Sequence, residues 1–174
     1  MVFDTQIAQY FSQIVGQNRT FDLAMVFLAE ILPWLLVALA LWFIYNKYRR
    51  QILDFVYVAL SLVVARFGVN EIIYFFFQRP RPMDLGYPAL LAQQPNPSFP
   101  SGHASFLLAM SWAVFLCCGK KPGILLVFFS SLSLVARMYC GAHFLSDILG
   151  GAVIGISSAY ILWKFYFSKK CAVF

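Results

Sequence analysis

The chain has 174 residues, of which 61% are hydrophobic and only 11% are charged. Soluble domains carry about one quarter charged residues, so this composition excludes an ordinary soluble domain. It predicts a single integral membrane domain over residues 1–174. The formal charge of +6 would suit nucleic acid, but most Lys and Arg residues flank apolar segments. That placement follows the positive-inside rule, so we expect no nucleic-acid partner.

Residues 1–20 form the first segment, which is too polar to span a bilayer. Apolar side chains recur in it at roughly helical spacing, at Val2, Phe3, Ile7, Tyr10, Phe11 and Ile14. This pattern predicts a helix that lies in the membrane interface. The segment lacks the basic start, short apolar stretch and small-residue cleavage site of a signal peptide, so we expect no cleaved leader.

Apolar runs that are long enough, or nearly long enough, to cross a bilayer follow in order. They lie at about 23–45, 52–77, 104–118, 123–138 and 145–167. Pro33 is expected to kink the first run, and the third and fourth runs are short. The predicted fold class is therefore all-α: a polytopic transmembrane helix bundle of about five spans plus an N-terminal interfacial helix.

The charges between these runs predict the orientation. In a five-span bundle, the links 46–51 and 119–122 and the C-terminal tail share one side. These segments hold eight of the thirteen basic residues: Lys47, Arg49, Arg50, Lys120, Lys121, Lys164, Lys169 and Lys170. The positive-inside rule makes that side cytoplasmic. The C-terminus is therefore expected inside, and the long loop 78–102 outside.

The cysteines at 117, 118, 140 and 171 show no disulfide spacing. In the topology above, Cys140 lies on the opposite side of the membrane from the other three. We therefore expect no disulfide bridge, and we interpret Cys117 and Cys118 as small core residues.

Polar and charged residues gather where three segments end on the outer side. One segment is "FFFQRPRPMD", the second opens with "PSGH", and the third is "ARMYCGAHFLSD". Both histidines of the chain are among these residues. Histidines that only pack in a core would not be expected to gather at one membrane boundary. The candidate site residues are Arg79, Arg81, Ser101, Gly102, His103, Arg137, His143 and Asp147.

This set of side chains suits phosphoryl transfer. Guanidinium groups bind phosphate oxygens through paired hydrogen bonds, and a helix start offers free N–H groups. Ser101 can cap such a start, and Gly102 lets an oxyanion approach the backbone closely. His143 and Asp147 are four residues apart, so on a helix the carboxylate could fix the imidazole tautomer and leave a nucleophilic nitrogen. His103 would remain to protonate a leaving oxygen.

These motifs resemble the type-2 phosphatidic acid phosphatase family, which shares its site architecture with vanadium haloperoxidases. Arg81-Pro82 closes the family's first motif, Pro100–His103 is the second, and Arg137-x5-His143-x3-Asp147 is the third. The resemblance covers about residues 72–150. It implies His143 as nucleophile, Asp147 as its partner and His103 as general acid. It also implies a phosphate cradle of Arg81, Arg137, Ser101 and Gly102, with no metal or other cofactor.

One departure from the family concerns the charge of the cradle. The family has Lys seven residues before the Arg-Pro pair, where this chain has Tyr74. Tyr74 is still a candidate phosphate-binding residue, because a tyrosine can donate one hydrogen bond, but it supplies no charge. We therefore expect Arg79 to provide the third cation. Arg66, deeper in the second span, is the alternative. Arg66 could equally form a structural ion pair with Glu30 or Glu71.

The favoured function is a membrane phosphatase that acts on a lipid phosphate or diphosphate. The loop 83–99 has one charge, Asp84, which suits a small headgroup. The short chain and its "RPRP" resemble small bacterial undecaprenyl diphosphate phosphatases, which implies the bacterial inner membrane with the site facing the periplasm. Phosphatidylglycerophosphate, phosphatidate and lipid A 1-phosphate are alternative substrates. Two other hypotheses remain: a lipid-binding pseudoenzyme, and a metal site of His103, His143 and Asp147, whose neighbouring arginines would repel a cation.

Overall fold

The structure is a computed structural model that describes residues 2–47, 51–92 and 95–171. Every regular element in these residues is helical, which confirms the predicted all-α class. The elements are α1 (Val2–Ile14), α2 (Arg19–Glu30), α3 (Leu32–Tyr45), α4 (Gln51–Val63), the π-helical η1 (Val64–Val69), α5 (Asn70–Phe76), the 3₁₀ turn η2 (Met83–Leu85), α6 (Gly102–Cys118), α7 (Lys120–Tyr139) and α8 (Leu145–Cys171).

The predicted count of five spans is not confirmed. Among the described residues, three helical stretches are long and apolar enough to cross a membrane: 52–76, 120–139 and 145–165. Helices α2 and α3 make a fourth if the pair counts as one span with a 42° bend. Pro33 stands in the first turn of α3, where its missing N–H is tolerated. This bend lies where the sequence predicted a kink.

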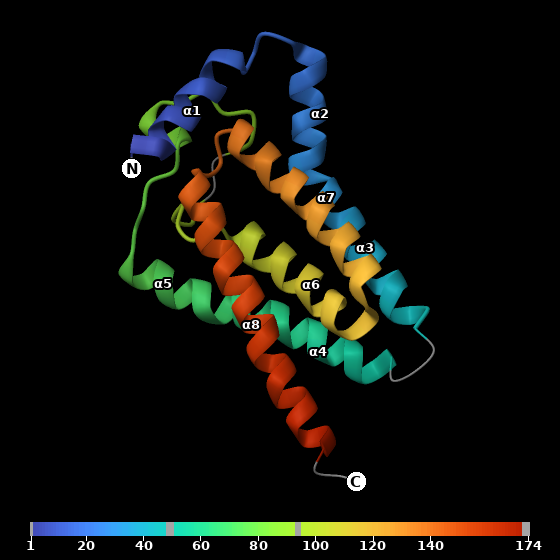
Figure 1. Ribbon diagram of the computed structural model, residues 1–174. Coiled ribbons are helices and arrows are strands. Elements are labelled where there is room, and N and C mark those ends of the chain that lie inside the picture. Colours follow the sequence, from blue (N-terminus) through green and yellow to red (C-terminus); the bar gives the residue numbers. More distant parts are fainter. Residues whose placement is uncertain (1, 48–50, 93–94, 172–174) are drawn as a thin grey trace.

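The remaining apolar helix, α6, is shorter and lies inside the bundle. Its 17 residues give a length of about 25 Å, less than the ~30 Å hydrocarbon core of a bilayer. Figure 1 shows α6 between α4, α7 and α8. A helix that is apolar all round is stable when its neighbours cover it, and eleven of the α6 residues are buried.

Helix α8 crosses α6 at close range because two glycines face it. A methyl group added at Gly151 would lie 2.5 Å from the Ser101 carbonyl oxygen, and one at Gly155 would lie 2.4 Å from that of Ser105. Any larger residue would push the helices apart. This small-residue pair therefore brings the start of α8 next to the start of α6, where two of the candidate motifs lie.

The lysine-rich segments lie together, at the end of the bundle opposite the motifs. The end of α3, the junction of α6 and α7 and the last turns of α8 occupy one end, whereas α1, the start of α6 and the start of α8 occupy the other (Figure 1). Lys47 pairs with Asp54 at 2.6 Å and also donates to the carbonyl of Cys117. Arg49 and Arg50 lie outside the described residues.

Helix α1 is present as predicted, but it also packs on the protein. It lies across the motif-bearing end (Figure 1), and Phe11 and Ile14 pack against the small core around Tyr139. Phe3 and Tyr10 remain exposed. The structure thus places part of α1 on the bundle, whereas the sequence predicted only a membrane-facing role.

Of the three cysteines that the structure describes in full, Cys117 and Cys140 are buried and Cys118 is half-buried, and all three are free thiols.

Candidate active site

The imidazole of His143 lies at the centre of the motif cluster, in the turn between α7 and α8. Its Nδ1 is 3.1 Å from the carbonyl oxygen of Ser98. Because a carbonyl can only accept, Nδ1 carries the proton, and the Nε2 of the neutral ring has a free lone pair. Nε2 lies 3.4 Å from Nη1 of Arg81. The nitrogen that could attack therefore faces a guanidinium group.

The expected pairing of His143 with Asp147 is indirect in the structure. The two side chains are 3.9 Å apart at their closest approach, which is too long for a hydrogen bond. His143 precedes α8, so the two residues do not share a helical face as the spacing suggested. Ser98 links them instead: its carbonyl accepts from His143, and its hydroxyl donates to Asp147 at 2.5 Å.

Asp147 is fully buried and caps the start of α8. Its Oδ2 accepts from the backbone N–H of Phe144 at 2.7 Å, and its Oδ1 accepts from Arg79 at 2.6 Å. A side chain at the third helical position that bonds back to the cap residue's N–H is the second half of a capping box. The carboxylate thereby fixes the turn that carries His143. Ser98 is a site residue that the motifs do not include, and its only signal was its place two residues before Pro100.

The second motif forms the start of α6, as predicted. Ser101 is the N-cap, and its hydroxyl accepts from the N–H of Ala104 at 3.4 Å. The N–H of Ser101 donates to the carbonyl of Asp147 at 2.9 Å, so this start is tied to the start of α8. Gly102 is buried, and His103 is half-buried on the wall of a pocket.

Tyr74 stabilises the loop before α6. It is 5% exposed, and its hydroxyl donates to the carbonyl of Pro100 at 2.8 Å. One turn earlier, the Asn70 amide exchanges hydrogen bonds with the Ser105 hydroxyl, at 2.7 and 3.0 Å. Tyr74 was expected to contact phosphate, but its one donated hydrogen bond is used to hold the loop. Asn70 and Ser105 are further supports that the sequence reasoning did not identify.

Arg81 and Arg137 are both buried, and both are held by backbone carbonyls. Arg81 donates from Nη1 to Ala142 at 3.0 Å and from Nε to Asn96 at 3.0 Å. Arg137 donates from Nη1 to the carbonyl of Ala29 at 2.9 Å and to the Glu30 carboxylate at 3.2 Å. Within the described part of the chain, Nε and Nη2 of Arg137 are buried without a hydrogen-bond partner. Buried donors are nearly always satisfied, so these two fit an oxyanion.

Arg79 binds carboxylates, although the sequence suggested a place in the phosphate cradle. Its Nη1 donates to Asp147 and to the Ser146 hydroxyl, both at 2.6 Å, and its Nη2 donates to Asp4 at 2.9 Å. Its guanidinium also lies 4.5 Å from the ring centroid of Phe144. These contacts give Arg79 a role in holding the start of α8.

Asp4 is a further residue that sequence reasoning missed. It is 7% exposed and accepts from the backbone N–H of Ser146 at 3.0 Å and from its hydroxyl at 2.7 Å. Burial raises the pKa of Asp4, but the hydrogen bonds from Ser146 and Arg79 outweigh it, so that the pKa is lowered overall. Helix α1 is thereby fastened to the first turn of α8. Nothing in the composition of α1 signals this contact.

Replacing Arg79 distinguishes a supporting role from phosphate binding. Arg79→Ala leaves the buried Asp147 carboxylate without its cation, so we expect a loss of about 3 kcal/mol or more in the free energy of unfolding, seen as a lower Tm in detergent. Arg19→Ala, which removes an exposed arginine, should leave the Tm unchanged. A weaker affinity for phosphate with an unchanged Tm would instead return Arg79 to the cradle.

The pKa of His143 is lowered well below the ordinary value. Burial is the main cause, and the positive charges of Arg81 and Arg137 add to it. Burial also lowers the pKa of Arg81. Because a lowered pKa means that a proton binds only at lower pH, His143 stays neutral through the range in which an ordinary histidine becomes charged.

This neutrality can be measured directly, because the chain has only two histidines. In a His103→Gln variant, we expect the ¹⁵N shifts of His143 to report a neutral ring with the proton on Nδ1 at about pH 6, where an ordinary histidine is mostly protonated. An imidazolium signal at that pH would contradict the burial and charge argument.

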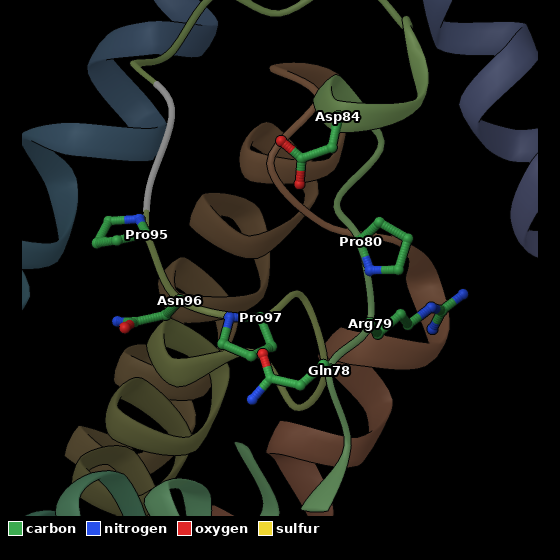
Figure 2. Close-up of a pocket in the computed structure, with 7 residues that line it drawn as sticks. All are labelled: Gln78, Arg79, Pro80, Asp84, Pro95, Asn96 and Pro97. Atoms are coloured by element: carbon green, nitrogen blue, oxygen red, sulfur yellow. The ribbon is translucent and has the colours of Figure 1, made fainter. Parts of the chain in front are cut away.

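A surface pocket of about 550 Å³ lies between two parts of the long loop, residues 78–84 and 95–97. Figure 2 shows Gln78 to Pro80 on one side of it and Pro95 to Pro97 on the other, with Asp84 above. The side chain of Arg79 points away from Pro95 to Pro97. The carbonyl of Asn96, on this wall, accepts from Arg81. His143 is not among the residues that line this pocket.

The alternative of a metal site finds no ligand set among the residues that the structure describes: no three His, Cys, Asp or Glu side chains are grouped to hold an ion. The acidic neighbour of His143 is bound to Arg79, and Arg81 faces its free nitrogen. This arrangement suits an anion.

Comparisons with known proteins identify the family of the chain. Residues 54–171 match the sequence profile of the PAP2 superfamily. The chain is 30% identical over 151 residues to the undecaprenyl-diphosphatase BcrC of Bacillus subtilis (strain 168), which covers 85% of this chain and 76% of BcrC.

Two solved structures share the fold. One is LpxE of Aquifex aeolicus, with a TM-score of 0.75 and 20% identity over 92% of this chain and 94% of LpxE. The other is a PAP2-type phosphatidylglycerolphosphate phosphatase from Bacillus subtilis, with a TM-score of 0.68 and 18% identity over 93% and 83% of the two chains. The profile match covers more than half of the chain, and the sequence relative and the fold agree with it. The chain therefore belongs to the PAP2 superfamily and is an integral membrane phosphatase.

Proposed function

We propose that this phosphatase hydrolyses a lipid diphosphate, most simply undecaprenyl diphosphate, through a phosphohistidine intermediate. The observation that carries the mechanism is the orientation of His143: the Nδ1 proton is held by Ser98, and the free Nε2 faces Arg81. The identity with BcrC over most of both chains supports the substrate. The single acidic charge in the loop 83–99 supports a small headgroup.

In the proposed first step, the terminal phosphate enters between Arg81, Arg137 and the start of α6. Its oxygens replace the missing partners of Arg137 and accept from the N–H group of Gly102 at the start of α6. The lone pair of Nε2 attacks phosphorus, a P–N bond forms, and the bond from phosphorus to the bridging oxygen breaks. Burial and the nearby Arg137, Arg66 and Arg81 lower the pKa of His103 to about 3, and the negative charge of the bound diphosphate raises it again, so that His103 binds a proton. His103 then gives this proton to that oxygen, and the lipid monophosphate leaves.

In the second step, water attacks the phosphohistidine. His103, now neutral, takes a proton from the water, and the P–N bond breaks to restore neutral His143 and release inorganic phosphate. The roles of Asp147 and Arg79 are indirect. They hold Ser98 and the turn before α8, so that the His143 imidazole keeps its tautomer and its orientation toward the phosphate.

The substrate proposal is tested with a panel of lipids and purified protein in detergent. Undecaprenyl diphosphate should give the highest kcat/KM, above phosphatidylglycerophosphate, phosphatidate and lipid A 1-phosphate, and chelator should not change the rates. A higher kcat/KM on one of the other lipids would replace the substrate. Binding without release of phosphate would support the pseudoenzyme, and loss of activity with chelator would support the metal alternative.

The proposed orientation places the site on the outer face and the lysine-rich end inside. A cysteine-free variant with Ala92→Cys, an exposed loop position, should react with an impermeant maleimide on intact cells. The loop position Gln93 lies outside the described residues. A reporter fused after residue 174 should read cytoplasmic. Labelling of Ala92→Cys only after permeabilisation would invert the topology.

A further inference from the structure

A second pocket, of about 250 Å³, lies beside the start of α6. It is lined mainly by apolar side chains of α3, η1 and α6, including Trp34, Phe67 and Phe106. Arg66 and His103 also line it, whereas His143 and Arg81 do not. The pocket thus shares the proposed general acid with the site but not the proposed nucleophile.

Arg66 is directed to the start of α6. A methyl group added at Gly102 would lie 2.7 Å from Nε of Arg66 and 3.1 Å from its Cδ, so the guanidinium lies against the backbone that begins the helix. Its Cζ also lies 5.7 Å from the ring centroid of Tyr74. The side chain is only 20% exposed. This arginine is therefore closer to the predicted phosphate-binding backbone than Arg79, which is bound to Asp147 and Asp4.

Arg66 lies in the π-helical segment Val64–Val69, four residues before Asn70 and eight before Tyr74. Tyr74 and Asn70 both bond to the loop and helix of the "PSGH" motif. Residues four apart lie on one side of a helix, so Arg66 faces the same motif from the preceding turn. Segments of this kind are frequent at functional sites.

We propose that Arg66 binds the phosphate of the leaving group and thereby selects lipid diphosphates over lipid monophosphates. In an in-line transfer the leaving group lies opposite the nucleophile, which is the side of His103. The apolar walls of the pocket suit the apolar chain of a lipid, and Arg66, beside the proposed general acid His103, suits the phosphate at the end of that chain. This proposal rests on the mechanism above and adds a ligand for the second phosphate.

The acidic neighbours of Arg66 compete with the phosphate for its guanidinium group. Glu71, 50% exposed, accepts from Nη1 at 2.7 Å, and Glu30 lines the same pocket. A phosphate must share the guanidinium with Glu71, and the forked group can bind both through different edges. A purely structural ion pair is the competing explanation, and Glu71→Gln breaks that same pair from its other side.

The test compares farnesyl diphosphate with farnesyl monophosphate as substrates. Arg66→Gln should lower kcat/KM for the diphosphate by about 10- to 100-fold, the usual effect of losing a hydrogen bond to a charged group. For the monophosphate the loss should stay below about 3-fold. Glu71→Gln should leave the ratio of the two kcat/KM values unchanged. Arg66→Lys, which keeps the charge but not the fork, should fall between wild type and Arg66→Gln.

Inhibition gives the same comparison without turnover of a monophosphate. Arg66→Gln should raise the inhibition constant of pyrophosphate and leave that of inorganic phosphate unchanged. Equal losses on both substrates, or a Glu71→Gln variant that behaves like Arg66→Gln, would overturn the proposal. If Arg66→Gln does not fold, as judged by its Tm, Arg66→Lys decides by the same ratio. A wild-type protein inactive on both lipids would instead refute the proposed function.

Discussion

Replacing His143 with alanine is expected to abolish turnover of the lipid diphosphate. The fall in kcat should be about three orders of magnitude or more, because residues that act as one catalytic unit fail together. The physical reason is that the substitution removes Nε2 of His143, the proposed nucleophile, which lies against Arg81. Release of inorganic phosphate from purified protein in detergent is the measurement.

The covalent intermediate provides the control for this result. Wild-type protein quenched during turnover with a ³²P-labelled diphosphate should carry acid-labile, base-stable label, and His143→Ala should carry none. Asp147→Asn should retain a small activity, because its carboxylate acts on His143 through Ser98 and not by direct contact. Near wild-type activity of His143→Ala on the best substrate would show that the mechanism is wrong.

Replacing His103 with glutamine should lower the rate of the first turnover by about two to four orders of magnitude on an alkyl phosphate, the usual range for general acid–base catalysis. An alkoxide leaves only with a proton, whereas an activated aryl oxide leaves without one. The loss on 4-nitrophenyl phosphate should therefore be much smaller. The lipid diphosphate should lie between the two, since a phosphate is less basic than an alkoxide.

Rapid quenching within one turnover is needed for this comparison, because His103 also activates water in the second step. In the His103→Gln variant, labelled phosphoenzyme should form slowly and then persist. Equal losses of first-turnover rate on the alkyl and aryl phosphates would exclude His103 as the acid and leave it a structural role.

The sequence by itself was sufficient for the helical class and for the family. Apolar composition and the length of the apolar runs leave few options for a chain in a bilayer, since backbone groups there must bond within a helix. The "PSGH" sequence specifies a helix start by local contacts alone, because a serine side chain can accept a hydrogen bond from a backbone N–H of the first turn. Ser101 is the N-cap of α6 in this way. The lysine pattern likewise grouped Lys47 with Lys120 and Lys121, and in the structure Lys47 donates to the carbonyl of Cys117, three residues before Lys120.

The number of spans was less accessible to sequence reasoning. The run from 104 to 118 reads as apolar whether it faces lipid or other helices, because hydropathy does not distinguish the two. Only packing shows that α6 is an inner helix, contacted closely by α8 through Gly151 and Gly155.

Only the tertiary structure decided which cation does what. Arg79 and Arg66 are both arginines near the motifs, and sequence spacing favoured Arg79 because it is two residues from Arg81. In the fold, two buried carboxylates, Asp4 and Asp147, bind Arg79, and one of them comes from the far end of the chain. Arg66 lies against Gly102 at the start of α6. Ion pairs and close contacts between residues distant in sequence depend on three-dimensional packing, so a pattern of residue types along the chain does not contain them.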